Sequence, residues 1–123
     1  MQDKLAGFDH RGVTLLPSRW QRQVTQARDL YAALSEDALL HGFRAQAGLP
    51  APGLAMAGWC STTSSVIFGQ IVSGLAVLGT ALDDPTLHAK AARLVTAYAE
   101  TLPPDGNAHM QLYDWDNTNR HNF

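Results

Sequence analysis

A long uncharged block limits what this chain can fold into. From Ala45 to Leu82 there is no Asp, Glu, Lys, Arg or His. The last part of the block, residues 64–82, is the most apolar stretch of the chain, and apolar side chains cover most of its circumference when it is drawn as a helix. A helix that is apolar nearly all round is buried inside a protein or a membrane. The block therefore predicts a central, buried helix over residues 64–82.

The same segment is long enough to span a membrane. Its polar side chains argue against that location, as does the lack of nearby flanking Lys or Arg and of an aromatic belt at both ends. We therefore expect a core helix rather than a membrane span; the polar residues in question are Ser64, Ser65, Gln70, Ser73 and Thr80.

Size and charge exclude several classes of protein. The chain has 123 residues, which suit one compact domain. Its formal net charge of −2 argues against a nucleic-acid-binding protein and against a polybasic membrane anchor. Cys60 is the single cysteine, so an intramolecular disulfide is impossible. The first ten residues lack an apolar signal segment; the compartment is unknown from the sequence, with the cytoplasm as the default expectation.

Apolar spacing and capping residues predict four helices, over residues 18–34, 36–45, 64–82 and 85–102. Ser18, Ser35 and Asp84 are the expected N-caps, and Pro85 suits the first position of a helix. Glycines and prolines between residues 48 and 58 predict a loop. The predicted fold class is all-α, with the four helices arranged as two antiparallel hairpins.

The ends of the chain are expected to differ from its middle. Residues 1–17 are punctuated by glycine and proline and predict an irregular segment. Residues 18–106 form the predicted helical region. Residues 107–123 are polar, with scattered aromatic side chains and no periodicity, and predict a disordered tail.

The most unusual local sequence runs from Trp59 to Ser65 and combines an indole, a thiol and five hydroxyl groups. An indole can pack on the apolar face of a sugar ring, and hydroxyl groups can bond its hydroxyls. This composition predicts a carbohydrate contact at Trp59, Ser61 and Thr62. The alternative is structural: Trp59 anchors the loop while the hydroxyl groups cap the helix that follows.

The remaining reactive side chains form no recognisable catalytic set. Cys60 has no histidine within the uncharged block to act as its base. The five histidines are scattered, without the spacing of metal ligands, so no metal site is predicted. The pairs Glu36–Asp37 and Asp83–Asp84 lie where helix starts favour acidic residues.

A series of short motifs, in order along the chain, resembles the N-terminal part of glycoside hydrolase family 127, the β-L-arabinofuranosidase-like proteins. The likeness covers about residues 12–106. The motifs that carry it are Leu16-Pro17-Ser18-Arg19-Trp20, Asp29-Leu30-Tyr31, Leu39-Leu40, Phe43-Arg44, Ala47-Gly48-Leu49-Pro50, Gly58-Trp59, Phe68-Gly69-Gln70, Ser73-Gly74-Leu75-Ala76 and the stretch from Asp84 to Lys90.

The resemblance implies part of an (α/α)6 toroid in which the full domain uses a cysteine nucleophile on a zinc ion, with a glutamate as acid/base. No residues of this chain match that set, so no cofactor is expected in this chain alone. Members commonly have Gly-His where this chain has Gly69-Gln70, which would add Gln70 to a sugar contact.

Two functions follow as expectations from these patterns. The first is a fragment of a carbohydrate-active glycoside hydrolase that is catalytically incomplete alone. The second is a small, non-enzymatic helical interaction module that self-associates or binds a partner. We expect the chain to self-associate through apolar helix faces left exposed, because exposed apolar patches favour association.

Overall fold

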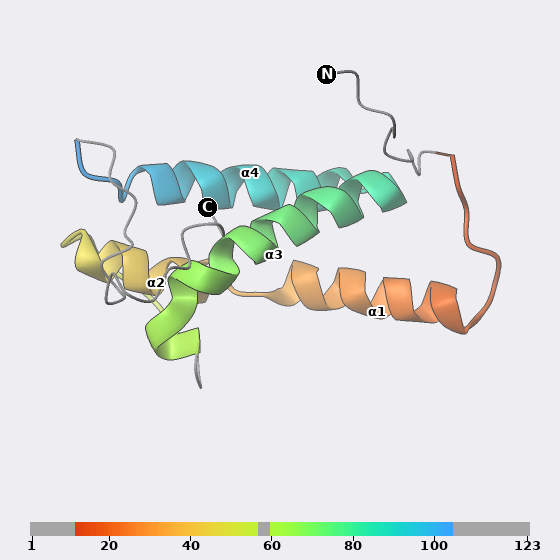
Figure 1. The fold of residues 1–123 in the computed structure, drawn as a ribbon, viewed down its shortest axis with the longest axis horizontal. Helices are drawn as coiled ribbons and strands as arrows, with labels where there is room; N and C mark the ends of the chain where they lie inside the picture. The colour runs from red at the N-terminus through yellow and green to blue at the C-terminus, as the bar shows by residue number, and fades with distance from the viewer. Residues whose placement is uncertain (1–11, 57–59, 105–123) are drawn as a thin grey trace, which may run out of the picture.

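The computed structural model describes residues 12–56 and 60–104, and the side chains of residues 12–56 and 67–104. Within these residues the chain forms four helices and no strand (Figure 1). The predicted all-α class is confirmed. The helices are α1 (Arg19–Ala33), α2 (Glu36–Gln46), α3 (Cys60–Leu82) and α4 (Pro85–Ala99).

The three expected N-caps begin their helices. The Ser18 hydroxyl accepts a hydrogen bond from the Gln21 amide, and the Ser35 hydroxyl accepts one from Ala38. Asp84 accepts from the Thr86 amide at 2.9 Å, with Pro85 at the first helical position. Each cap supplies an acceptor for an amide that has no partner inside its helix. The local sequence therefore sets where α1, α2 and α4 begin.

Two helix boundaries differ from the sequence prediction. Helix α3 begins at Cys60 rather than residue 64, so the hydroxyl-rich run lies within the helix instead of preceding it. No glycine or proline interrupts residues 60–65, so nothing in that run stops a helix. Helix α4 ends at Ala99 rather than residue 102, because Thr101 and Leu102 make tighter bonds to carbonyls three residues back.

Helices α3 and α4 form the predicted antiparallel hairpin, but α1 and α2 do not form a second one. Helices α1 and α2 follow each other nearly end to end, and both pack against the α3–α4 hairpin (Figure 1). The connection consists of Leu34 and Ser35, whose backbones are both extended. Because an extended connection carries the chain onward, it does not fold α2 back along α1.

The core lies where α2, α3 and α4 meet. Phe43 of α2 is completely buried, and its ring meets Phe68 of α3 and Tyr98 edge-on, with centroid distances of 5.2 and 4.9 Å. Edge-to-face aromatic pairs add to the energy of burial. Leucines from the three helices complete the core: Leu39, Leu40, Leu75, Leu87 and Leu94.

Helix α3 is less buried than its composition predicts. Phe68 and Leu75 are buried in the core, but Val77 is 66% exposed, and Ser73 and Thr80 are also exposed. In the part whose side chains are described, α3 therefore has one side open to solvent. Composition alone could not show this, because it reports no neighbours.

The predicted irregular N-terminal segment and tail fall partly outside the described residues. Residues 12–17 form neither helix nor strand, and Val13, Leu15 and Leu16 are exposed. Residues 1–11 and 105–123, including the predicted tail over 107–123, lie outside the described part of the chain. Among the helices as described, none combines the length and the hydropathy that crossing a bilayer requires.

Candidate functional site

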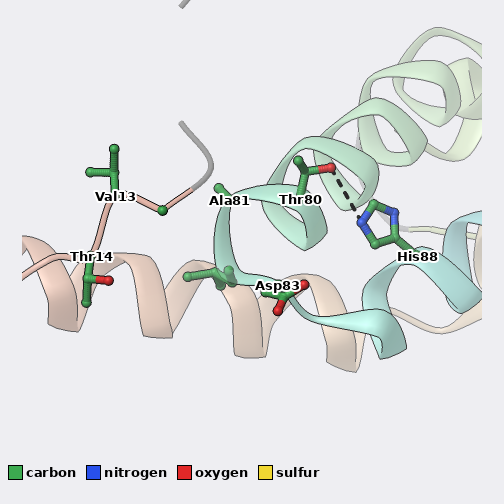
Figure 2. A pocket seen from close by; sticks show the side chains of 8 residues that line it. Val13, Thr14, Thr80, Ala81, Asp83 and His88 are labelled. Carbon is green, nitrogen blue, oxygen red and sulfur yellow. Dashed lines mark hydrogen bonds between the residues drawn. The ribbon is translucent and has the colours of Figure 1, made fainter. Parts of the chain in front are cut away.

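A cavity of about 650 Å³ lies at the turn between α3 and α4 (Figure 2). The N-terminal segment contributes one wall, the C-terminal end of α3 a second, and α4 a third. Its polar groups come from two threonines, a carboxylate and an imidazole, and the other side chains are small or apolar. The lining residues are Gly12, Val13, Thr14, Thr80, Ala81, Leu82, Asp83 and His88.

Asp83 forms this turn by adopting a left-handed backbone conformation, with φ of 52°. Aspartate tolerates that region better than most residues do. The amide of Asp84 donates to the carbonyl of Gly79 at 2.8 Å, and the amide of Asp83 donates to Thr80. This pair of bonds is the Schellman arrangement that ends helices. The turn thus directs α4 back along α3 and leaves Asp83 at the cavity edge.

His88 is positioned by its contact with α3. Its Nε2 lies 3.4 Å from the Thr80 hydroxyl (Figure 2). That hydroxyl donates to the Ala76 carbonyl at 3.0 Å, so its oxygen is left to accept from His88. A Cβ added to Gly79 would come within 3.1 Å of the imidazole ring. A side chain at position 79 would therefore push His88 away from Thr80.

The cavity is better suited to binding than to catalysis. Thr80 cannot be activated by His88 in this arrangement, because its proton is already directed at a main-chain carbonyl. Among the residues whose side chains are described, no three His, Cys, Asp or Glu come together as a metal site. The cavity can donate and accept hydrogen bonds, and it offers no nucleophile with a base beside it.

Next to the cavity, Asp84 connects α1 to the start of α4. One carboxylate oxygen accepts from the amide and hydroxyl of Thr86, and the other accepts from the Arg28 Nε of α1 at 2.8 Å. The Thr86 hydroxyl and the Arg28 guanidinium lower the pKa of Asp84 from 3.8 to about 2. Asp84 therefore stays charged in the folded protein under conditions where an unfolded aspartate is protonated.

Acid should weaken the protein through Asp84. A carboxylate whose pKa is lower when folded contributes its full stabilisation above its unfolded pKa and loses it as the pH falls through the folded one. The window set by these two pKa values is from about pH 4 to about pH 2. We expect the urea midpoint of the wild type to fall across this window more steeply than that of Asp84→Asn.

Asparagine is the matched control for this measurement, because its side-chain oxygen still caps α4 but does not titrate. The difference between the two proteins removes the contribution of the other carboxylates. Parallel midpoint curves for wild type and Asp84→Asn from pH 5 to pH 2 would show that Asp84 is not the titrating group.

The predicted sugar-contact residues are spread along and before α3. Trp59 lies outside the described residues. Ser61 and Thr62 lie in the first turns of α3, and Gln70 is an exposed residue farther along it. Because a helix rises about 1.5 Å per residue, Thr62 and Gln70 are about 12 Å apart along its axis. A single sugar ring could not contact both at once, and their role in sugar binding stays a prediction.

Sequence reasoning missed the polar groups that fix α1. Arg28 bonds to Asp84, which lies 56 residues farther along the chain. Lys90 is 6% exposed, and its ammonium donates to the carbonyls of Ala32 and Leu34, at 2.8 Å in the first case. Burial lowers the pKa of Lys90. One feature of the sequence could have indicated this contact. Lys90 lies three residues after Leu87, on the apolar side of an amphipathic helix.

The fold and the cavity describe an all-α protein with a polar pocket at a helix turn. The family described as β-L-arabinofuranosidase, GH127 catalytic domain, matches residues 12–111. The chain belongs to this family of glycoside hydrolases, as the order of its motifs predicted. No curated protein and no solved structure gives a significant match to the chain.

Proposed function

We propose that this chain forms part of a β-L-arabinofuranosidase-like catalytic domain and is catalytically incomplete alone. The family match over residues 12–111 is the observation that carries the proposal. Retaining hydrolysis of a glycoside requires a nucleophile and a separate group acting as acid and base. Cys60 is the one cysteine, so a cluster of cysteines cannot come from this chain. Zinc, where the family uses it, would have to be held by residues beyond those present here.

The proposed contribution of this chain is structural and substrate-binding. Trp59, Ser61, Thr62 and Gln70 are the proposed sugar contacts. The exposure of Gln70 supports this role, because its amide is open to a ligand. Given their separation along α3, we propose that Gln70 meets a different sugar unit, or a different part of the substrate, from the one at Thr62.

The purified chain should not hydrolyse aryl β-L-arabinofuranosides, with or without added zinc. The expected result is a rate equal to the buffer blank, because no complete catalytic set is available. Release of the aryl group measured by absorbance tests this directly. The control is Cys60→Ala, which should give the same blank rate. Turnover that disappears in Cys60→Ala would contradict the proposal and make Cys60 the nucleophile.

A helical interaction module is the second candidate, and exposed apolar side chains favour it. Trp20 is 55% exposed on α1, and Leu30, Val77 and Val95 are also exposed. Light scattering at several concentrations separates the candidates when combined with arabinose binding. Concentration-dependent association without sugar binding favours the interaction module. Sugar binding that is lost in Gln70→Ala favours the hydrolase part.

A further inference from the structure

Helix α1 is attached to the rest of the protein differently from the other helices. It has no buried residue along its whole length, whereas α2 buries Leu39, Leu40 and Phe43. Only its C-terminal end, through Tyr31 and Ala32, packs against the core. Because burial of apolar area is the main stabilising contribution in packed helices, α1 gains less from docking than its neighbours do.

A cavity separates the N-terminal half of α1 from α3. It has a volume of about 430 Å³, and its walls include Val24 of α1, Leu78 and Leu82 of α3, and residues 13–15 of the segment before α1. Side chains that line an open pocket lack the contacts that a close-packed interface would supply. The two helices are therefore poorly packed along this half of α1.

Polar contacts replace the missing apolar ones. Arg28 bonds to Asp84 at 2.8 Å and lies 3.5 Å from the Thr86 hydroxyl. Lys90 donates to the carbonyls of Ala32 and Leu34 at the end of α1. Both side-chain groups link α1 to α4 directly. Two cationic side chains, Arg28 on α1 and Lys90 on α4, therefore hold the two helices together.

The close fit of Tyr31 on α3 is the third contact. A Cβ added to Gly74 would lie 2.7 Å from a ring carbon of Tyr31 and 2.9 Å from its hydroxyl oxygen. Such distances are shorter than real side chains show, so a side chain at position 74 would displace the ring. The absence of a side chain at Gly74 is what lets α1 approach α3.

The adjoining helices do not depend on α1 for their own ends. Ser35 caps α2 with its hydroxyl, and the extended residues Leu34 and Ser35 form the whole connection. Asp84 caps α4 through one carboxylate oxygen and binds Arg28 through the other. Release of α1 would thus leave both neighbouring caps in place.

We propose that α1 is a separable arm that docks on and leaves the α2–α3–α4 core as a unit, held by the Arg28–Asp84 pair, Lys90 and the Tyr31–Gly74 contact. Release pivots at Leu34 and Ser35. It opens the pocket that Leu78 and Leu82 of α3 form with Val24 of α1. The device does not depend on the hydrolase function.

Native-state hydrogen exchange tests whether α1 leaves the core as a unit. In the wild type, α1 amides are expected to exchange through an opening that α3 and α4 do not share. Arg28→Met should speed exchange throughout α1 by roughly tenfold, which matches the loss of a hydrogen bond between charged groups, and leave α4 unchanged. Arg22→Met is the matched control, because Arg22 is exposed on the same helix and pairs with no described residue. It should leave exchange unchanged.

Gly74→Ala is a second, independent way to release α1, because the added Cβ displaces Tyr31. It should speed the exchange of α1 amides more than that of α4 amides. Salt at 1 M should accelerate the exchange of α1 amides in the wild type, because it screens the Arg28–Asp84 pair. It should have less effect in Arg28→Met, which lacks the pair. Equal exchange of α1 and α4 in the wild type would overturn the proposal. So would an Arg28→Met variant that exchanges faster in every helix to the same extent. If a variant fails to fold, the wild-type pattern alone decides.

Discussion

Phe43→Ala is expected to lower the free energy of unfolding by about 3–5 kcal/mol, the range for removing a buried aromatic ring. Phe43 is fully buried, and its ring is the one that both Phe68 and Tyr98 meet edge-on. Removal leaves a cavity at the point where α2, α3 and α4 join. Because small domains are stable by about 5–15 kcal/mol, this loss is a large fraction of the total. Urea denaturation followed by circular dichroism measures it.

The control for Phe43→Ala is Val77→Ala, because Val77 is a large apolar residue that the fold leaves exposed. Its substitution should change the free energy of unfolding by less than about 0.5 kcal/mol. Phe43→Leu, which fills part of the space, should lie between the two variants and remains measurable if Phe43→Ala does not fold. Equal effects of Phe43→Ala and Val77→Ala would show that the aromatic cluster is not the core.

Lys90→Met should have the second-largest effect, a loss of about 1–3 kcal/mol, which is the range for leaving buried polar groups without partners. Methionine ends where the Cε of lysine lies, so the apolar part of the side chain is kept and the change removes the ammonium group. The carbonyls of Ala32 and Leu34 lose their donor, and α1 loses one of its connections to α4. Urea denaturation of the purified variant measures the loss.

Arg93→Met is the comparison for Lys90, because Arg93 lies one turn away on α4 and pairs with Glu36 at an exposed position. Exposed ion pairs contribute little, so this variant should lose clearly less stability. If Lys90→Met is as stable as the wild type, the desolvation of the ammonium offsets its hydrogen bonds, and Lys90 then contributes nothing to the docking of α1.

The sequence was sufficient wherever a feature depends on residues close together in the chain. Ser18, Ser35 and Asp84 could be identified as caps because a cap is satisfied within three residues. The end of α2 was equally local: Gly48, at φ of 70°, follows its last turn. The family could also be recognised in advance, because its motifs are short, local and in a fixed order.

Helix boundaries were less predictable where local signals were weak. The start of α3 was expected at residue 64 because hydroxyl residues are frequent at caps, yet the helix begins at Cys60. The same residues are tolerated within a helix, and the sequence alone does not decide between these two uses. The predicted sugar-contact residues were affected by this choice, since Ser61 and Thr62 became part of α3.

Long-range contacts decided the rest. Trp20, a large apolar residue, is exposed on α1, whereas the charged Arg28 of the same helix is bound to Asp84. Periodicity shows which side chains share a face, and it does not show what lies opposite that face. Only the tertiary structure placed Asp84 and Lys90 next to α1, from far along the chain. The sequence determined four helices and most of their caps, whereas the tertiary structure determined which of their faces are covered, because burial depends on neighbours that are distant in sequence.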